Sequence, residues 1–290
     1  MSDVHDKRDV RDVSDISTRA ADAVVGVDFT SRPSRRKPIT LAQGERHGAV
    51  LRLQRVLRFD TLDAFALWLA QPGAWVGAFD LPFGLPRELV VALGWPQQWR
   101  ALIAHYAALP REQVRAAFKA FCDARPVGGK FAHRATDGPA GSSPSMKWVN
   151  PPVAYMLHAG VPLLLRAGVH LPGLHAGDVQ RVALEGYPGL LARELIGTRS
   201  YKSDTTARQT AERLIARKDI IAALEAGRTR LGLRLKLSAL QAEQLADDGS
   251  GDLLDAALCM VQAAWGAAQG APHYGLPANI DPLEGWVLSA

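Results

Sequence analysis

Five acidic residues stand at places in the sequence where carboxylates commonly do chemistry. Asp28 closes the apolar run "AVVGVDF", Asp80 ends a second apolar run, "WVGAFD", and Glu185 ends a third, "RVALE". Asp252 and Asp255 open the long apolar segment "GDLLDAALCMVQAAW", three residues apart, so they share one face of a helix. In an open sheet, ligands gather outside the carboxyl ends of the strands. The pattern therefore indicates a site built from acids at strand ends.

Each acid also has a purely structural interpretation. A lone Asp after a strand is often a turn residue, and Glu185 could be a solvated strand end. Asp252 follows Gly251 and could cap the helix, while the carboxylate of Asp255 could be stabilised by the positive end of the helix dipole. Asp255 fits its structural interpretation least well, because the helix around it is nearly all apolar and a buried acid needs a partner.

Taken together, the acids predict a site for two divalent cations. Carboxylate oxygens are preferred ligands of Mg²⁺ and Mn²⁺, and paired ions lie about 3.5–4 Å apart in such sites. The pair orients an attacking water and stabilises the leaving oxygen of a phosphodiester. We expect Asp28, Asp80, Asp252 and Asp255 to be the metal ligands and catalytic residues, with Glu185 as a further catalytic acid. Convergence of the first four in space is the decisive expectation.

The apolar runs that carry the acids predict a mixed sheet. The valine-rich first run indicates a buried strand, and the third strand alternates apolar and polar residues. Gly26, on the same strand face as Asp28, is expected to leave room beside the carboxylate. We predict an α/β fold with a five-stranded sheet in the order 3-2-1-4-5 and helices on both faces. The expected strands are 23–29, 39–43, 49–59, 74–80 and 181–185, with a helix from Asp60 or Thr61 to Ala70.

The remaining chain is expected to be mainly helical. Pro162 should kink or end the helix that contains it. Residues 125–152 are rich in Gly, Pro and Ser and are too long for a plain connector. We predict a disordered tail over residues 1–20 and a single domain over 21–290, with a helical and loop insertion at about 87–178. The expected helices are 87–93, 96–108, 111–124, 152–168, 188–196, 204–226 and 252–268.

Basic residues close to the acid motifs are candidates for binding phosphate. One group follows Asp28 directly, a second lies in the long loop, and a third follows the Glu185 motif. Solvated turns, a solvated loop and a helix cap are the alternative interpretations. The formal net charge of +5 permits an anionic partner without requiring one. The predicted substrate-binding residues are Arg32, Arg35, Arg36, Lys37, Lys130, Arg134, Lys202 and Arg208.

Composition limits the class of protein. The chain has 290 residues, of which 48% are hydrophobic, enough for a substantial core. No apolar run approaches the ~20 residues of a membrane helix, and the N-terminus lacks the apolar stretch of a secretory signal. Cys122 and Cys259 form no CxxC pair, which suits buried thiols in a reducing cytoplasm. We expect a cytoplasmic protein with no membrane partner, and the oligomeric state stays open.

Five ordered motifs resemble those of a bacterial family, domain-of-unknown-function family 429. They are "GVDFTS", "AFDLPFGLP", "LEGYPGLLARELIG", "YKSDTTARQ" and "DLLDAALCMVQAAW". The resemblance implies an RNase-H-like fold and nuclease activity, which are themselves predictions for that family. It places the first-strand acid at Asp28, the fourth-strand acid at Asp80 and the helix pair at Asp252 and Asp255. Related Holliday-junction resolvases carry Glu in the fourth strand, so here a shorter side chain must reach the same metal.

Three functions stay open at this level. The leading prediction is a metal-dependent nuclease that hydrolyses phosphodiester bonds of DNA or RNA with two Mg²⁺ or Mn²⁺ ions. The second is a nucleotide-dependent phosphotransferase of the actin and sugar-kinase type, suggested by "DFTS", although the glycine-containing "DDGSGD" opens a helix instead of forming a second phosphate loop. The third is a non-catalytic scaffold that retains the fold.

Overall fold

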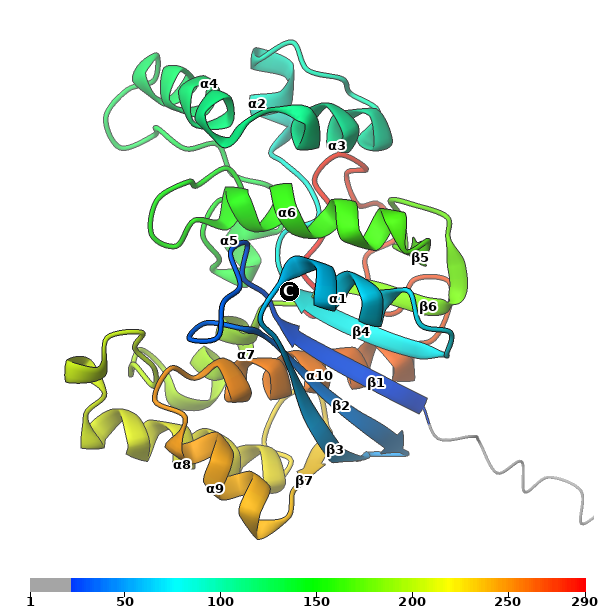
Figure 1. Ribbon diagram of the computed structural model, residues 1–290, viewed down its shortest axis with the longest axis vertical. Coiled ribbons are helices and arrows are strands. Elements are labelled where there is room, and N and C mark those ends of the chain that lie inside the picture. The colour runs from blue at the N-terminus through cyan, green and yellow to red at the C-terminus, as the bar shows by residue number, and fades with distance from the viewer. Residues whose placement is uncertain (1–21) are drawn as a thin grey trace, which may run out of the picture.

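A mixed sheet with helices on both faces forms the centre of the molecule (Figure 1). The computed structural model describes residues 22–290, so the predicted N-terminal tail lies outside the described residues. The sheet has seven strands in the order β5-β6-β4-β1-β2-β3-β7. Their bounds are β1 Asp22–Asp28, β2 Ile39–His47, β3 Val50–Phe59, β4 Trp75–Asp80, β5 Val169–His170, β6 Asp178–Glu185 and β7 Arg234–Lys236.

The prediction of a five-stranded sheet is therefore wrong. Strands β3, β2, β1, β4 and β6 lie side by side in that order, and β5 and β7 add a strand at each edge. Strand β1 runs antiparallel to β2 and parallel to β4, while β4 runs parallel to β6. The two added strands have two and three residues. Segments this short cannot show the alternation by which strands are found in a sequence.

Two helical layers cover the sheet. Helices α7, α8, α9 and α10 pack on one face, where Val24 and Ala78 point, and α1, α2, α3, α4 and α6 bury side chains in the core on the other face, where Val25 and Phe79 point. Each strand thus contributes alternate residues to two cores. The helices are α1 Leu62–Leu69, α2 Arg87–Ala92, α3 Trp99–Ala108, α4 Arg111–Asp123, α5 Asp137–Ala140, α6 Val153–Arg166, α7 Pro188–Ile196, α8 Ala211–Glu225, α9 Ala239–Asp247 and α10 Asp252–Gln269.

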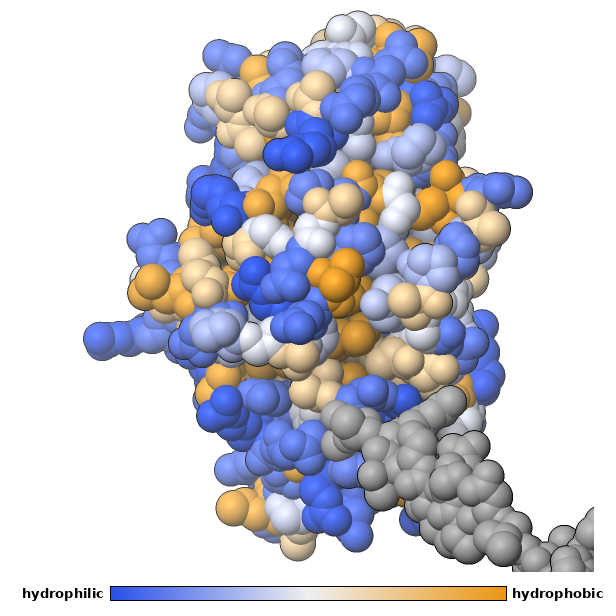
Figure 2. All heavy atoms as spheres, turned by 90° about the vertical axis from the view of Figure 1, so that its right-hand side faces the viewer, coloured by the Kyte–Doolittle hydropathy of each residue, from blue (hydrophilic) through white to orange (hydrophobic). Residues whose placement is uncertain are grey.

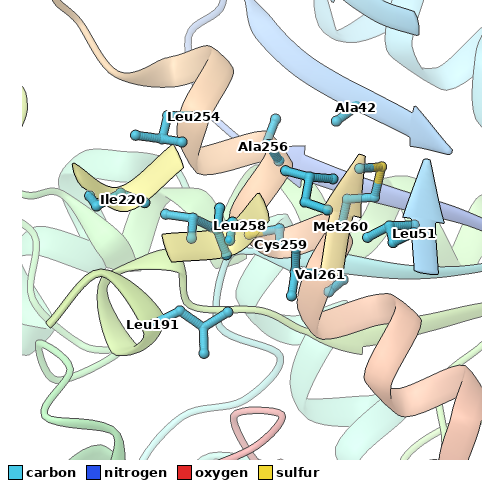
Figure 3. Packing of buried hydrophobic residues seen from close by; sticks show 14 of the residues in the cluster. Ala42, Leu51, Leu191, Ile220, Leu254, Ala256, Leu258, Cys259, Met260 and Val261 are labelled. Atoms are coloured by element: carbon cyan, nitrogen blue, oxygen red, sulfur yellow. The ribbon is translucent and has the colours of Figure 1, made fainter. Parts of the chain in front are cut away.

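Helix α10 lies directly on the middle of the sheet. Figure 3 shows its buried residues, among them Leu258 and Met260, packed between β-strand residues such as Ala42 and helix residues such as Leu191. At Gly26, an added Cβ would lie 2.0 Å from the Met260 nitrogen and 2.1 Å from the Ala256 oxygen. The expectation that Gly26 leaves room beside Asp28 is therefore wrong, because the backbone of α10 fills that space.

Several helices differ from their predicted bounds. Helix α1 begins as expected, with the Thr61 hydroxyl accepting a hydrogen bond from the Ala64 amide. Helix α6 continues past Pro162 to Arg166, so the proline does not end it. Residues 204–210 are not α-helical: α8 begins at Ala211, after a short 3-10 turn at Thr206–Arg208. Helix α9 was not predicted, and its Ser238–Gln241 capping box is the signal that could have found it.

The surface of the described residues mixes hydrophilic and hydrophobic side chains. Of the helices in residues 22–290, none combines the length and the apolar character needed to cross a bilayer. On the face in Figure 2, hydrophobic residues lie in separate groups among hydrophilic ones. Exposed large hydrophobic side chains are scattered over different elements, for example Leu67 on α1, Val179 on β6 and Ile215 on α8. Cys122 and Cys259 are both buried and unpaired.

Candidate active site

Asp28 and Asp80 lie next to each other at the carboxyl ends of β1 and β4. The two strands are parallel neighbours, and the two residues are paired in register. Residues in register on neighbouring strands project from the same sheet face. Val24 and Ala78, which share the faces of Asp28 and Asp80, pack in the core beneath α10, so both carboxylates are on the α10 side.

Asp252 and Asp255 reach the same place from the start of α10. The helix begins after Gly251, whose φ of 80° is in the left-handed region that favours glycine. Asp255 is fully buried and accepts a hydrogen bond of 2.5 Å from the Tyr201 hydroxyl, and it forms an ion pair with Lys202. Lys37 donates to Asp252 over 2.8 Å. The close contact of α10 with β1 at Gly26 sets how far these acids lie from Asp28.

The four acids interact electrostatically. Burial raises the pKa of Asp28 well above its usual range, and the charges of Asp255 and Asp252 raise that pKa further, while Lys202 opposes them. The pKa of Asp80 is also raised, to about 7. Burial is the main cause, the charge of Asp255 adds to it, and the charge of Lys202 opposes it. Neighbouring carboxylates out of water disfavour one another's charged form. The four carboxylates are therefore close enough to affect one another's charge, and that they share an ion stays a prediction.

Two lysines supply positive charge to this acid cluster. Lys37 contacts Asp252 and also donates to Asp204 over 2.6 Å. Although desolvation opposes the charged amine, Asp255 raises the pKa of Lys202 well above its usual range, so the amine stays protonated. Asp28 and Asp80, by contrast, form no ion pair with any residue in 22–290. Two of the four acids thus have a cationic partner and two do not.

The carboxylates of the acid cluster suit hard divalent cations, although two of them, Asp252 and Asp255, contact lysine amines instead. Within residues 22–290, no three His, Cys, Asp or Glu side chains are already gathered into a metal-binding group. Carboxylate oxygens are nevertheless the ligands that Mg²⁺ and Mn²⁺ prefer. The acids that would hold the ions are Asp28, Asp80, Asp252 and Asp255. Burial raises the pKa values of Asp28, Asp80 and Asp252, and a bound cation would lower them again.

Glu185 lies in a buried ion pair, and its predicted catalytic role stays a prediction. It ends β6 beside β4 and contributes to the raised pKa of Asp80. However, both of its oxygens are engaged by the buried Arg134, over 2.7 and 2.8 Å, and one also accepts from the Phe83 amide. Arg134 is bound on its other side by Asp137, over 3.0 Å. A carboxylate held in this way stabilises the fold through its ion pair with Arg134.

The predicted phosphate-binding residues are spread over several places. Lys37 and Lys202 lie at the acid cluster, whereas Arg134 is buried in ion pairs and lines a neighbouring cavity. The other five predicted residues are exposed, and three of them are in the loop between β1 and β2 that also carries Lys37. The exposed residues are Arg32, Arg35, Arg36, Lys130 and Arg208.

A cavity of about 380 Å³ adjoins the acids and was not predicted. Asp80 and Lys202 line it together with Tyr187, Arg193 and Arg199. The residues from α7 lie within "LEGYPGLLARELIG", but only the fold brings them beside β4. Tyr201, which binds Asp255, was also missed, although it directly precedes Lys202 in the sequence.

No protein-family model, curated protein or solved structure matches this chain. The motif resemblance to family 429 therefore stays a prediction. What the site can do follows from its own charges and geometry.

Proposed function

We propose that this protein is a divalent-cation-dependent nuclease that hydrolyses phosphodiester bonds of DNA or RNA. The observation that carries the proposal is the pair Asp28 and Asp80, in register on neighbouring strands and without a cationic partner among residues 22–290, facing Asp252 and Asp255 of α10. Buried carboxylates that repel one another are costly to keep unless they serve a charged ligand.

The proposal assigns a role to each side chain at the cluster. Asp28 and Asp80 hold the cations from the sheet side, and Asp252 and Asp255 hold them from the helix side. When bound, two Mg²⁺ or Mn²⁺ ions supply an activated water and stabilise the leaving oxygen. Tyr201 orients Asp255 through its 2.5 Å hydrogen bond. Lys37 and Lys202 balance the acids and attract the phosphate group of a substrate.

The surface around the acids suits an anionic polymer. Arg32, Arg35 and Arg36 are exposed in the loop that leads from Asp28 to Lys37. Basic side chains of this kind contact phosphates and position a strand without reading its sequence. The net charge of +5 supports the same class of partner. These arginines therefore belong to the proposed binding surface and not to the catalytic group.

We further propose an RNase-H-like arrangement within the larger sheet. The neighbours β3-β2-β1-β4-β6, with β2 antiparallel to the strands on either side of it, support this assignment. The acids at the ends of β1 and β4, with a late helix crossing them, support it too. The edge strands β5 and β7 are then additions to that arrangement.

A metal titration tests the proposed function. Purified protein is incubated with single-stranded, duplex and branched DNA and RNA, with Mg²⁺ or Mn²⁺ added from zero to millimolar concentration. We expect cleavage that depends on the metal and falls on the order of 1,000-fold in Asp28→Asn. Calorimetry should show Mn²⁺ binding to the wild type that Asp28→Asn loses.

A matched control is Asp123→Asn. Asp123 is exposed on α4 and pairs only with Lys119, one turn before it. This variant should retain wild-type cleavage and Mn²⁺ binding. If the wild type cleaves none of these substrates with either metal, or if Asp28→Asn cleaves as well as the wild type, the proposed function is wrong.

A further inference from the structure

The cavity beside the acid cluster has the size and position of a substrate pocket. It lies where α6 and α7 flank the carboxyl end of β4 (Figure 1), and Asp80 and Lys202 belong to both the cavity and the acid cluster. Its volume of about 380 Å³ is at the lower end of the range of ~300–1,000 Å³ for small-molecule pockets. A single nucleotide fits such a volume, whereas a base-paired duplex does not.

One wall of the cavity offers a flat aromatic and cationic surface. The guanidinium carbon of Arg193 lies 5.3 Å from the centre of the Tyr187 ring, and one of its nitrogens donates to the Tyr187 hydroxyl over 3.2 Å. Arg193 also donates to the carbonyl of Ala140 at the end of α5. The pair is therefore held in place from two elements. Aromatic rings and arginine planes are the surfaces on which unpaired bases stack.

The rest of the lining includes both apolar and charged residues. Pro151, Val153 and Met156, at the start of α6, give an apolar surface, and the nearby Ser142 and Ser143 bring hydroxyl groups. Arg199 and Lys202 carry positive charge at the lining that includes Asp80. A base would thus meet apolar and planar groups, while its phosphate would meet cations next to the acids.

We propose that this cavity binds the base and sugar of one unpaired nucleotide, whose phosphate lies at Lys202 and the acid cluster. The proposal rests on the proposed function and names its substrate class: single strands, strand ends, or nucleotides extruded from a duplex. A base inside an intact duplex must leave its stack to enter a closed pocket. Cleavage within uninterrupted duplex is therefore disfavoured.

The binding step can be tested without any cleavage. The chain has four methionines, and Met156 is at the cavity while Met146 and Met260 are buried elsewhere. Protein labelled with ¹³C at the methionine methyl groups is titrated with nucleoside monophosphates in EDTA, and Met156→Leu assigns the signal. We expect a saturable shift of the Met156 signal with a Kd of about 1 mM or tighter. Ribose 5-phosphate and inorganic phosphate should leave that signal in place.

A cavity-filling variant sharpens the test. Met156→Trp should weaken nucleoside monophosphate binding about tenfold or more, measured by competition or calorimetry. Leu67→Trp, on the exposed side of α1, is the matched control and should bind as the wild type does. Tyr187→Leu removes the aromatic wall and provides a second variant, and thermal unfolding establishes that each protein is folded.

The outcomes separate the cavity from the cleavage reaction. Binding of mononucleotides by a wild type that cleaves nothing would overturn the nuclease and leave the nucleotide pocket standing. Cleavage of intact duplex as fast as of single strands, unchanged in Met156→Trp, would overturn the pocket and leave the nuclease standing. Equal Met156 shifts with ribose 5-phosphate, or no shift with any nucleotide, would also overturn the proposed pocket.

Discussion

Two groups of buried charges lie close together at the carboxyl end of the sheet, and they are built in opposite ways. Around Arg134, every charge has a partner: Glu185 and Asp137 bind its guanidinium, and the Glu284 carbonyl accepts from it over 3.0 Å. Around Asp28 and Asp80, acids outnumber the cations that contact them. The contrast teaches that burial of an acid alone does not mark a functional residue. The candidates are the acids of a group whose negative charge is not fully balanced.

The largest expected effect on the free energy of unfolding comes from breaking the ion pairs around Arg134. Glu185→Gln removes one charge of a buried ion pair and leaves Arg134 under-compensated, which typically costs about 3–5 kcal/mol. Urea unfolding should show this loss. Asp123→Asn, which breaks the exposed pair with Lys119, should change the free energy of unfolding by less than about 1 kcal/mol. Equal effects of the two changes would contradict a structural role for Glu185.

A second change should affect both the stability of the fold and the acid cluster. In Gly26→Ala the new methyl group would meet the backbone of α10, so the helix must move. Overpacking of this kind typically costs about 1–3 kcal/mol. Because α10 carries Asp252 and Asp255, Mn²⁺ affinity measured by calorimetry should fall as well. Gly129→Ala, where an added Cβ meets only the Pro126 oxygen at 4.0 Å, should leave both quantities unchanged.

Full Mn²⁺ affinity in Gly26→Ala would contradict the view that the approach of α10 to β1 sets the geometry of the acids.

The expected effect of Asp80→Asn on stability has the opposite sign to that of Glu185→Gln. The pKa of Asp80 is raised to about 7, so the folded protein binds more protons than the unfolded chain between about pH 4 and 7. Ionised Asp80 therefore reduces stability as the pH rises through that window. In EDTA, Asp80→Asn should be more stable than the wild type at pH 8, by up to about 4 kcal/mol for a pKa shift of about three units, and this difference should shrink towards pH 5.

Thermal and urea unfolding at several pH values measure this difference. A difference that does not vary between pH 5 and pH 8 would show that Asp80 is compensated as Glu185 is.

The sequence predicts the acid cluster around Asp28 and Asp80 much better than the ion-pair group around Arg134. Asp28 and Asp80 follow long apolar strands whose neighbour relations can be reasoned out, and Asp252 and Asp255 open a helix with a clear apolar signature. The partnership of Glu185 and Arg134 joins residues 51 positions apart through an irregular loop. No periodicity reports such a contact. The same holds for the cavity, whose walls come from α6, α7 and the insertion.

The fold shows the same division. The inner strands have seven or more residues in most cases and a regular pattern, while β5 and β7 are too short to have one. From the sequence, Gly26 is recognisable only as a small residue. The need for glycine there comes from the close approach of α10, which lies more than 200 positions later. Contacts between distant segments decide these features, and a single sequence carries no record of them.

The position of α10 has a consequence for how the chain matures on the ribosome. Residues 252–269 are synthesised more than 200 residues after the first strand of the sheet, Asp22–Asp28, yet they pack against it. Until they emerge, one face of the sheet lacks its central covering and the carboxylates stand apart. A prematurely terminated polypeptide would therefore carry half of the acids and could not assemble the complete site.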